Sequence, residues 1–198
     1  MTYEELQEQK KQNFEAIAFQ YMDSLYSTAL RFTRNIEEAE DLVQDTYLRA
    51  FRFFDKFQEG TNFKAWIFKI LTNTFINKYR KKARTPQQVQ LDKVAYGLEN
   101  HDEDDKKLGE WSGYDESKYA DLFDDEISSA LSQLSEDFRM VVLLADIEGF
   151  SYKEIAQIIG RPSGTVMSRL FRGRRMLQRI LAKYANREGY IKQSLSNA

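Results

Sequence analysis

This sequence predicts an all-helical fold, in which two small helical domains are joined by a flexible acidic linker. The chain has 198 residues but only nine glycines and two prolines, a composition that favours helices over sheets and tight turns. Apolar residues recur at spacings of three and four in both halves of the chain, which is the period of an amphipathic helix. Between residues 85 and 118 this periodicity fails and like charges cluster, so the middle of the chain predicts a tether.

Charge is strongly segregated along the chain, although the formal net charge is only −2. Residues 61–84 contain seven basic side chains and no acidic one, and residues 161–187 contain eight basic and no acidic ones. Residues 99–126 carry twelve acidic and three basic side chains. Two basic segments separated by an acidic one indicate two nucleic-acid contacts and a linker.

The residue counts exclude several classes of function. The chain has no cysteine and one histidine, His101, in the acidic stretch, so we expect no disulfide, zinc finger, thiol catalysis, metal site or other cofactor. No phosphate-binding loop and no catalytic triad can be assembled from the sequence, and an enzyme is not expected. The polar N-terminus is not a secretory signal, and no apolar run reaches the roughly 20 residues of a membrane span.

The first half of the chain predicts three helices. Residues 12–34 and 36–56 each carry an apolar stripe at helical spacing, which predicts core packing. The outer face of the second helix is acidic and polar, and such a face is either solvated or a partner site. Its candidate residues are Asp41, Gln44 and Asp45.

A polar loop at residues 57–63 leads into the third predicted helix, 63–83. Phe63 stands on the loop, where an aromatic ring can stack on an unpaired base, although a core position is the more usual place for it. Amides and cations share one face of the helix, a combination that fits base and phosphate contacts. These residues are Asn73, Asn77, Arg80 and Lys81.

Helical periodicity returns after the tether. Residues 121–133 predict a helix, and Ser135 is the expected cap of the next one. A helix pair then follows over 150–179, and Ser151 and Glu154 have the spacing of a capping box. Gly160 is expected to end the first helix of this pair, Pro162 to block its continuation and Ser163 to cap the second helix. The tail beyond residue 184 predicts little order.

The second helix of this pair has two different faces. One is apolar, with Val166, Leu170 and Leu177 at helical spacing. The opposite face carries the candidate duplex-reading residues Thr165, Ser168, Arg169, Arg172 and Arg175. A buried stripe behind a row of guanidinium groups is typical of a helix-turn-helix in the DNA major groove. A surface hairpin with a solvated basic face is the alternative.

Three blocks in this order resemble bacterial RNA polymerase sigma factors of the sigma-70 family, in the small extracytoplasmic-function (ECF) class. They are DLVQDTYLRAFR, FKAWIFKILTNTFINKYR and FSYKEIAQIIGRPSGTVMSRLFRGRRML. The resemblance covers most of residues 12–181 and implies four segments. These are sigma region 2 over 1–84, the linker over 85–118, the region 4 helix-turn-helix over 119–185 and a tail over 186–198.

The resemblance also implies partners and site residues. Asp41, Gln44 and Asp45 would bind the clamp coiled coil in the largest subunit of core RNA polymerase, and the C-terminal domain would lie at the flap region. The single-stranded minus-10 element would meet Asn62, Phe63, Lys64, Asn73, Asn77, Arg80 and Lys81. The duplex minus-35 element would meet Thr165, Ser168, Arg169, Arg172 and Arg175. Met167 departs from the pattern, because many relatives carry a basic residue there.

The implied function is an alternative sigma factor that acts in the cytoplasm and directs initiation at promoter DNA. The block FRMVVLLADIEGFSYKEIAQIIG is similar to relatives of the oxidative-stress subgroup that are held by zinc-containing anti-sigma factors. Because this chain has no cysteine, the thiol sensor would be the partner. Two alternatives remain: a conventional helix-turn-helix operator-binding regulator, and an enzyme or RNA-binding adaptor.

Overall fold

The computed structural model describes residues 2–84 and 125–190, with the backbone alone for residues 79–84 and 125. All regular elements of this part of the chain are helical, which confirms the predicted fold class. The predicted tether at 85–118, with His101, lies outside the described residues, as do residues 191–198 of the tail.

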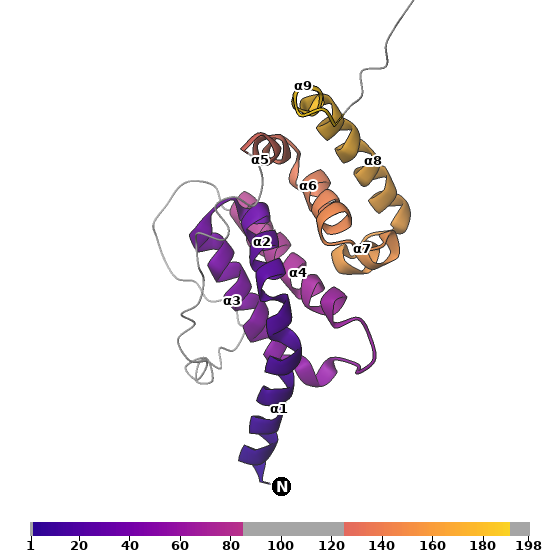
Figure 1. Cartoon of the computed structure of the whole chain (residues 1–198). Helices are drawn as coiled ribbons and strands as arrows, with labels where there is room; N and C mark the ends of the chain where they lie inside the picture. Colours follow the sequence, from indigo (N-terminus) through magenta and orange to yellow (C-terminus); the bar gives the residue numbers. More distant parts are fainter. Residues whose placement is uncertain (1, 85–124, 191–198) are drawn as a thin grey trace, which may run out of the picture.

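Helices α1 to α4 form the N-terminal domain, and α5 to α9 form the C-terminal one (Figure 1). The first domain comprises α1 (Tyr3–Ala18), η1 (Phe19–Tyr21), α2 (Met22–Thr33), α3 (Ile36–Arg52), η2 (Phe54–Lys56) and α4 (Phe63–Arg84). The second comprises α5 (Asp125–Ser132), α6 (Glu136–Val142), the π turn η4 (Leu143–Ile147), α7 (Tyr152–Ile159), α8 (Ser163–Ile180) and α9 (Ala182–Arg187).

The predicted single helix over 12–34 is in fact two helices, and the first begins earlier. Thr2 and Glu5 form a capping box that starts α1, a signal in the polar N-terminus that the apolar pattern does not contain. The break falls at η1, where the Tyr47 hydroxyl donates a hydrogen bond to the Ala18 carbonyl at 3.0 Å. Because Tyr47 belongs to α3, this interruption depends on a tertiary contact that local periodicity cannot predict.

The helix pair at the C-terminal end largely follows its sequence signals. Ser151 and Glu154 form the predicted capping box, and Gly160 ends α7 in the left-handed region with φ 61°. The predicted cap of the next helix is wrong by one residue, since Pro162 takes the cap position and Ser163 begins α8. The Pro162 carbonyl accepts hydrogen bonds from the amides of Thr165 and Val166, and a backbone acceptor therefore replaces the expected side-chain cap.

Helix α4 of the N-terminal domain forms the main contact with the C-terminal domain. It packs against α2 and α3 on one side and against α7 on the other (Figure 1). The buried apolar residues of both domains form one continuous cluster, in which the rings of Phe68 and Phe150 meet edge-on at 5.2 Å. The described structure is therefore a closed arrangement in which both predicted DNA sites belong to one packed body.

Candidate nucleic-acid interface

The loop before α4 and the first turn of that helix hold three predicted strand-contacting residues. Asn62 is exposed and its Oδ1 accepts a hydrogen bond from the Ala65 amide at 3.1 Å, so it fixes the start of the helix. Lys64 is half-buried. The ring of Phe63, which stands between these two polar residues, points into the N-terminal domain.

Phe63 is a core residue with only 6% of its surface exposed. Its ring stacks on Tyr21 with centroids 5.8 Å apart and meets Phe57 edge-on at 5.1 Å. Trp66 covers it from α4 at 5.4 Å. Because these covering rings all belong to the N-terminal domain, an unpaired base has no access to the Phe63 ring, and Phe63 instead gives the loop its shape.

The outer face of α4 carries two further predicted residues. Asn73 and Asn77 are one turn apart and both exposed, as a polar surface that follows a DNA strand requires. The next residue, Lys78, pairs with Asp45 of α3 at 2.9 Å. The side chains of Arg80 and Lys81 lie outside the described residues.

The predicted polymerase site lies on α3. Asp41 and Gln44 are exposed, and Asp45 is half-buried beside Lys78. A partner approaching this face therefore meets the carboxylate of Asp41, which has no ion pair with any described residue, and that of Asp45, which is already paired with Lys78.

Helix α8 has the two faces that its sequence predicts. Val166, Leu170 and Gly173 are buried against the domain, whereas Ser168, Arg172 and Arg175 are exposed and Thr165 is half-buried. Gly173 is needed for this close approach, because a Cβ there would lie 2.9 Å from Cγ2 of Val142. The helix thus presents its polar row outward on a rigid base.

Two arginines of α8 are held by carboxylates of their own domain. Arg169 bonds to Asp137 at 2.6 Å, and Nε of Arg174 donates to Asp146 at 3.1 Å. The hydrogen bond to Asp146 raises the pKa of Arg174 above its already high ordinary value. Of the predicted arginines, Arg172 and Arg175 thus remain without an ion pair to any residue that the structure describes.

An exposed apolar pair on α8 was not predicted as part of the site. Met167 is 49% exposed and Phe171, one turn further on, is 65% exposed. They border an open groove of about 660 Å³. Its lining residues are Tyr152, Met167, Leu170, Phe171, Arg174, Arg175 and Gln178. The signal in the sequence is the i, i+4 spacing of two apolar residues within the arginine row, which reasoning from charge alone passes over.

The C-terminal domain contacts the predicted strand site directly. Nζ of Lys64 lies 3.1 Å from Oε2 of Glu148 and donates to the Glu148 carbonyl at 2.8 Å. Nδ2 of Asn62 donates to Oε1 of Glu154 at 2.7 Å. Two carboxylates from the segment that begins the helix-turn-helix therefore bind two residues predicted to bind DNA.

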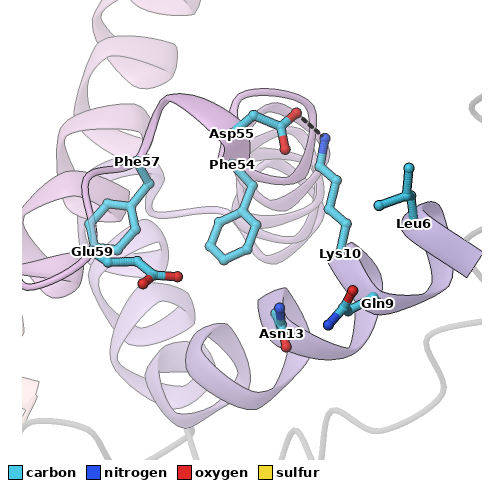
Figure 2. Close-up of a pocket in the computed structure, with 8 residues that line it drawn as sticks. All are labelled: Leu6, Gln9, Lys10, Asn13, Phe54, Asp55, Phe57 and Glu59. Atoms are coloured by element: carbon cyan, nitrogen blue, oxygen red, sulfur yellow. Dashed lines mark hydrogen bonds and ion pairs between the residues drawn. The ribbon is translucent and has the colours of Figure 1, made fainter. Parts of the chain in front are cut away.

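A second pocket, of about 410 Å³, lies between α1 and the η2 segment. Figure 2 shows the Phe54 ring turned toward α1 and the Lys10 ammonium bonded to Asp55, at 2.6 Å. The lining residues are Leu6, Gln9, Lys10, Asn13, Phe54, Asp55, Phe57 and Glu59. Lys10 also lies over the Phe51 ring at 5.2 Å, so the contacts at this pocket join α1 to the bundle.

Neither a candidate metal site nor a membrane span occurs among the described residues. No group of three or more His, Cys, Asp or Glu side chains there has the arrangement of a metal site. No described helix is long and apolar enough to cross a membrane.

Family models match both halves of the chain. Sigma-70 region 2 matches residues 18–85, and sigma-70 region 4 matches residues 124–177. The ECF RNA polymerase sigma factor SigE of Mycolicibacterium smegmatis is 35% identical over 88% of this chain, which spans 63% of that relative. EcfG of Rhodopseudomonas palustris, also an ECF sigma factor, is 37% identical over 80% of this chain and 79% of its own.

Solved structures share the fold. The sigma factor RpoE of Bartonella quintana, in complex with the anti-sigma factor NepR, is 32% identical with a TM-score of 0.64, covering 86% of this chain and 97% of its own. CnrH, in complex with the cytosolic domain of CnrY, has a TM-score of 0.59 at 23% identity and covers 90% of this chain and 96% of its own.

Proposed function

Since the chain belongs to the ECF class of RNA polymerase sigma factors in the sigma-70 family, we propose that it binds core RNA polymerase and directs initiation at specific promoters. It reads the minus-10 element as a single strand and the minus-35 element as duplex DNA. One observation carries the proposal: each of the two domains matches a sigma-70 region and presents a helix with polar and basic side chains on its outer face.

The N-terminal domain supplies the single-strand site. Opening duplex DNA costs about 1.4 kcal/mol of stacking per base step, and a factor without ATP recovers this through contacts with the opened strand. Asn62 on the loop, and Lys64, Asn73 and Asn77 along α4, offer amide and ammonium donors for those contacts. Arg80 and Lys81 continue the same sequence pattern, and Phe63 holds the loop in shape from the core.

The C-terminal domain supplies the duplex site. Arg172 and Arg175 are the side chains of α8 best placed for bidentate contacts with guanine or phosphate, with Thr165 and Ser168 beside them. Arg169 joins them only after releasing Asp137. Met167 and Phe171 add an apolar surface suited to the C5-methyl group of thymine.

Run-off transcription tests the proposal. The full chain is mixed with core RNA polymerase and a library of genomic promoter fragments, and transcripts are mapped. We expect transcripts that need both core enzyme and this chain, with start sites that share two upstream elements. A chain that binds duplex DNA but neither associates with core enzyme nor supports any transcript would instead be a conventional operator-binding regulator.

The polymerase contact on α3 has its own test. Asp45→Arg should weaken binding to core enzyme at least about tenfold, since it replaces a negative charge on this acidic face with a positive one. Lys78→Ala is the matched control: it removes the intramolecular partner of Asp45 and leaves the acidic face intact. Equal binding by the parent chain and Asp45→Arg, measured by competition for core enzyme, would contradict the assignment.

The chain would act in the cytoplasm, without catalytic activity of its own, under an anti-sigma partner. The Bartonella quintana relative is in complex with such a factor. We infer a zinc-containing partner of the oxidative-stress type from the resemblance of the helix-turn-helix block. Because this chain has no cysteine, a thiol oxidant should release it by acting on the partner. Co-purification from the native host, followed by zinc analysis and diamide treatment, tests this, and a zinc-free or oxidant-insensitive partner would contradict it.

A further inference from the structure

We propose that Glu148 and Glu154 hold this chain in a closed, self-inhibited form by occupying Lys64 and Asn62, the residues that would meet the minus-10 strand. The inference rests on the proposed function, because the masking matters only if these two residues bind DNA. It assigns a regulatory role to Glu154, which the sequence predicts only as part of a capping box, and to Glu148, for which the sequence predicts no role.

Glu148 makes the central contacts, and its side chain bonds to Lys64 and Thr28, both of the N-terminal domain. Its Oε2 faces Nζ of Lys64 at 3.1 Å, and its Oε1 accepts a hydrogen bond from the Thr28 hydroxyl at 2.8 Å. Its side chain is only 5% exposed. A carboxylate this buried becomes unfavourable once it loses its ammonium or hydroxyl partner, and it offers Lys64 the same kind of anionic oxygen as a DNA phosphate.

Lys64 is surrounded in this arrangement. Besides its contacts with Oε2 and the main-chain carbonyl oxygen of Glu148, its ammonium lies over the Phe150 ring at 5.0 Å and the Phe68 ring at 5.5 Å. These are favourable cation–π distances. To reach a phosphate, Lys64 must leave the carboxylate, the carbonyl and the Phe150 ring, all three of which belong to the C-terminal domain.

Glu154 masks Asn62 in the same way. The Asn62 amide donates to Oε1 of Glu154 at 2.7 Å, and this amide is the donor that a base acceptor would need. The other oxygen, Oε2, accepts from the Ser151 hydroxyl at 2.7 Å and the Ser151 amide at 2.8 Å. The capping box therefore holds the carboxylate rigidly in front of the loop.

The interface between the domains also contains a buried guanidinium, that of Arg139, which disfavours the closed form. Arg139 is 3% exposed and donates from Nη2 to the Phe32 carbonyl across the interface at 3.1 Å. Its Nη1 is buried without a hydrogen-bond partner among the described residues. A buried guanidinium that no carboxylate of the described residues neutralises is unfavourable, and separation of the domains would expose it to water. The closed form is therefore opposed by Arg139 and depends on contacts such as those of Glu148.

Fluorescence energy transfer between the domains tests the closed form without any DNA. The chain has no cysteine, so Glu37→Cys and Gln157→Cys, both at exposed positions, take donor and acceptor dyes. In this background Glu148→Gln and Thr28→Val should lower the transfer efficiency, while Glu188→Gln, a control at an exposed carboxylate of the same domain, should not. Unchanged efficiency in both interface variants, with circular dichroism showing intact helices, would overturn the proposal.

Binding of a short single-stranded DNA of random sequence tests the masking. If about a tenth of the molecules are in the open form, removing the contact between Glu148 and Lys64 should tighten binding of the single strand by up to about tenfold. We expect such a gain for Glu148→Gln relative to Glu188→Gln, which loses the same charge. A variant that opens but binds the strand no more tightly than the control would overturn the masking. If the proposed function were wrong, the chain would support no transcription with core enzyme. The energy transfer between the domains would still report the closed form, so the two failures can be told apart.

Discussion

The two predicted DNA sites of this chain differ in what already occupies them. In the N-terminal domain, Lys64 and Asn62 bond to Glu148 and Glu154 of the other domain. On α8, Arg172 and Arg175 face solvent. Both sites draw on the same residue types, namely polar and basic side chains on a helix. Their chemistry is set locally, whereas their availability is set by which other segments of the chain fold onto them.

This difference separates two requirements for DNA binding. The duplex site needs only a rigid helix that projects its side chains, and the buried stripe of α8 provides that. The strand site needs the domains to move apart, because its donors are satisfied inside the molecule. Duplex binding is therefore expected from the free chain, and tight strand binding only after opening.

Leu170→Ala should have the largest effect, because it removes part of the buried apolar packing that holds α8, and with it the duplex site, in place. Leu170 is 1% exposed in the core, and a truncation of this kind costs about 2–5 kcal/mol of the free energy of unfolding. Chemical denaturation and binding to a minus-35 duplex are the measurements. Leu170→Met is the control, with an expected loss below about 1.5 kcal/mol. An alanine variant as stable as this control would mean that α8 is not seated as described.

Arg172→Ala should come next, with a loss of about 1–3 kcal/mol in duplex binding if Arg172 contacts a base edge. The matched control is Arg174→Ala, which removes the same charge from the same helix, but from a side chain held by Asp146. Titrations with cognate and scrambled duplexes separate the outcomes. Equal losses for the two variants would show that general charge, and not the free arginine face, determines binding.

The fold was largely predictable because its signals are local. The capping box at Ser151 and the left-handed end at Gly160 depend on residues within one turn. The break after Ala18 was not predictable, because the hydroxyl that accounts for it belongs to Tyr47 on another helix. The apolar pattern also could not detect the start of α1, which depends on polar capping groups.

The site was predictable in its residue types and less so in its accessibility. Arg172 and Arg175 lie on the exposed face that their spacing predicts. Phe63 does not, because an aromatic residue at a helix start fits a core as well as a base, and only the surrounding rings decide between them. The contact between Lys64 and Glu148 joins residues far apart in the chain, and no spacing rule covers it.

Phe171→Ala should have a smaller effect than the loss of an arginine contact. Covering a thymine methyl group with the exposed ring should contribute about 0.8 kcal/mol to the binding free energy, the value for burying one CH₂ group. Replacing thymine by uracil at each position of the minus-35 duplex, one at a time, should locate the contact. At that position the parent chain loses affinity and Phe171→Ala does not. An equal loss in both proteins at every position would exclude methyl recognition by this ring.

The smallest effect concerns Glu154, which belongs both to the start of α7 and to the masked strand site. Hydrogen bonds from the Ser151 hydroxyl and then the Ser151 amide lower the pKa of Glu154, and Asn62 and Lys64 contribute less. Its stabilising effect is complete above the pKa of glutamate in the unfolded chain and is lost as the pH falls through the lower folded pKa. Glu154→Gln keeps an oxygen for the capping box but cannot titrate, so its melting temperature should depend less on pH between about pH 6 and about pH 3. Asn62→Ala should retain most of this pH dependence, because Ser151 provides the larger share. If Asn62→Ala instead flattened the profile as fully as Glu154→Gln, the carboxylate would be held mainly by the strand site and not by its own helix.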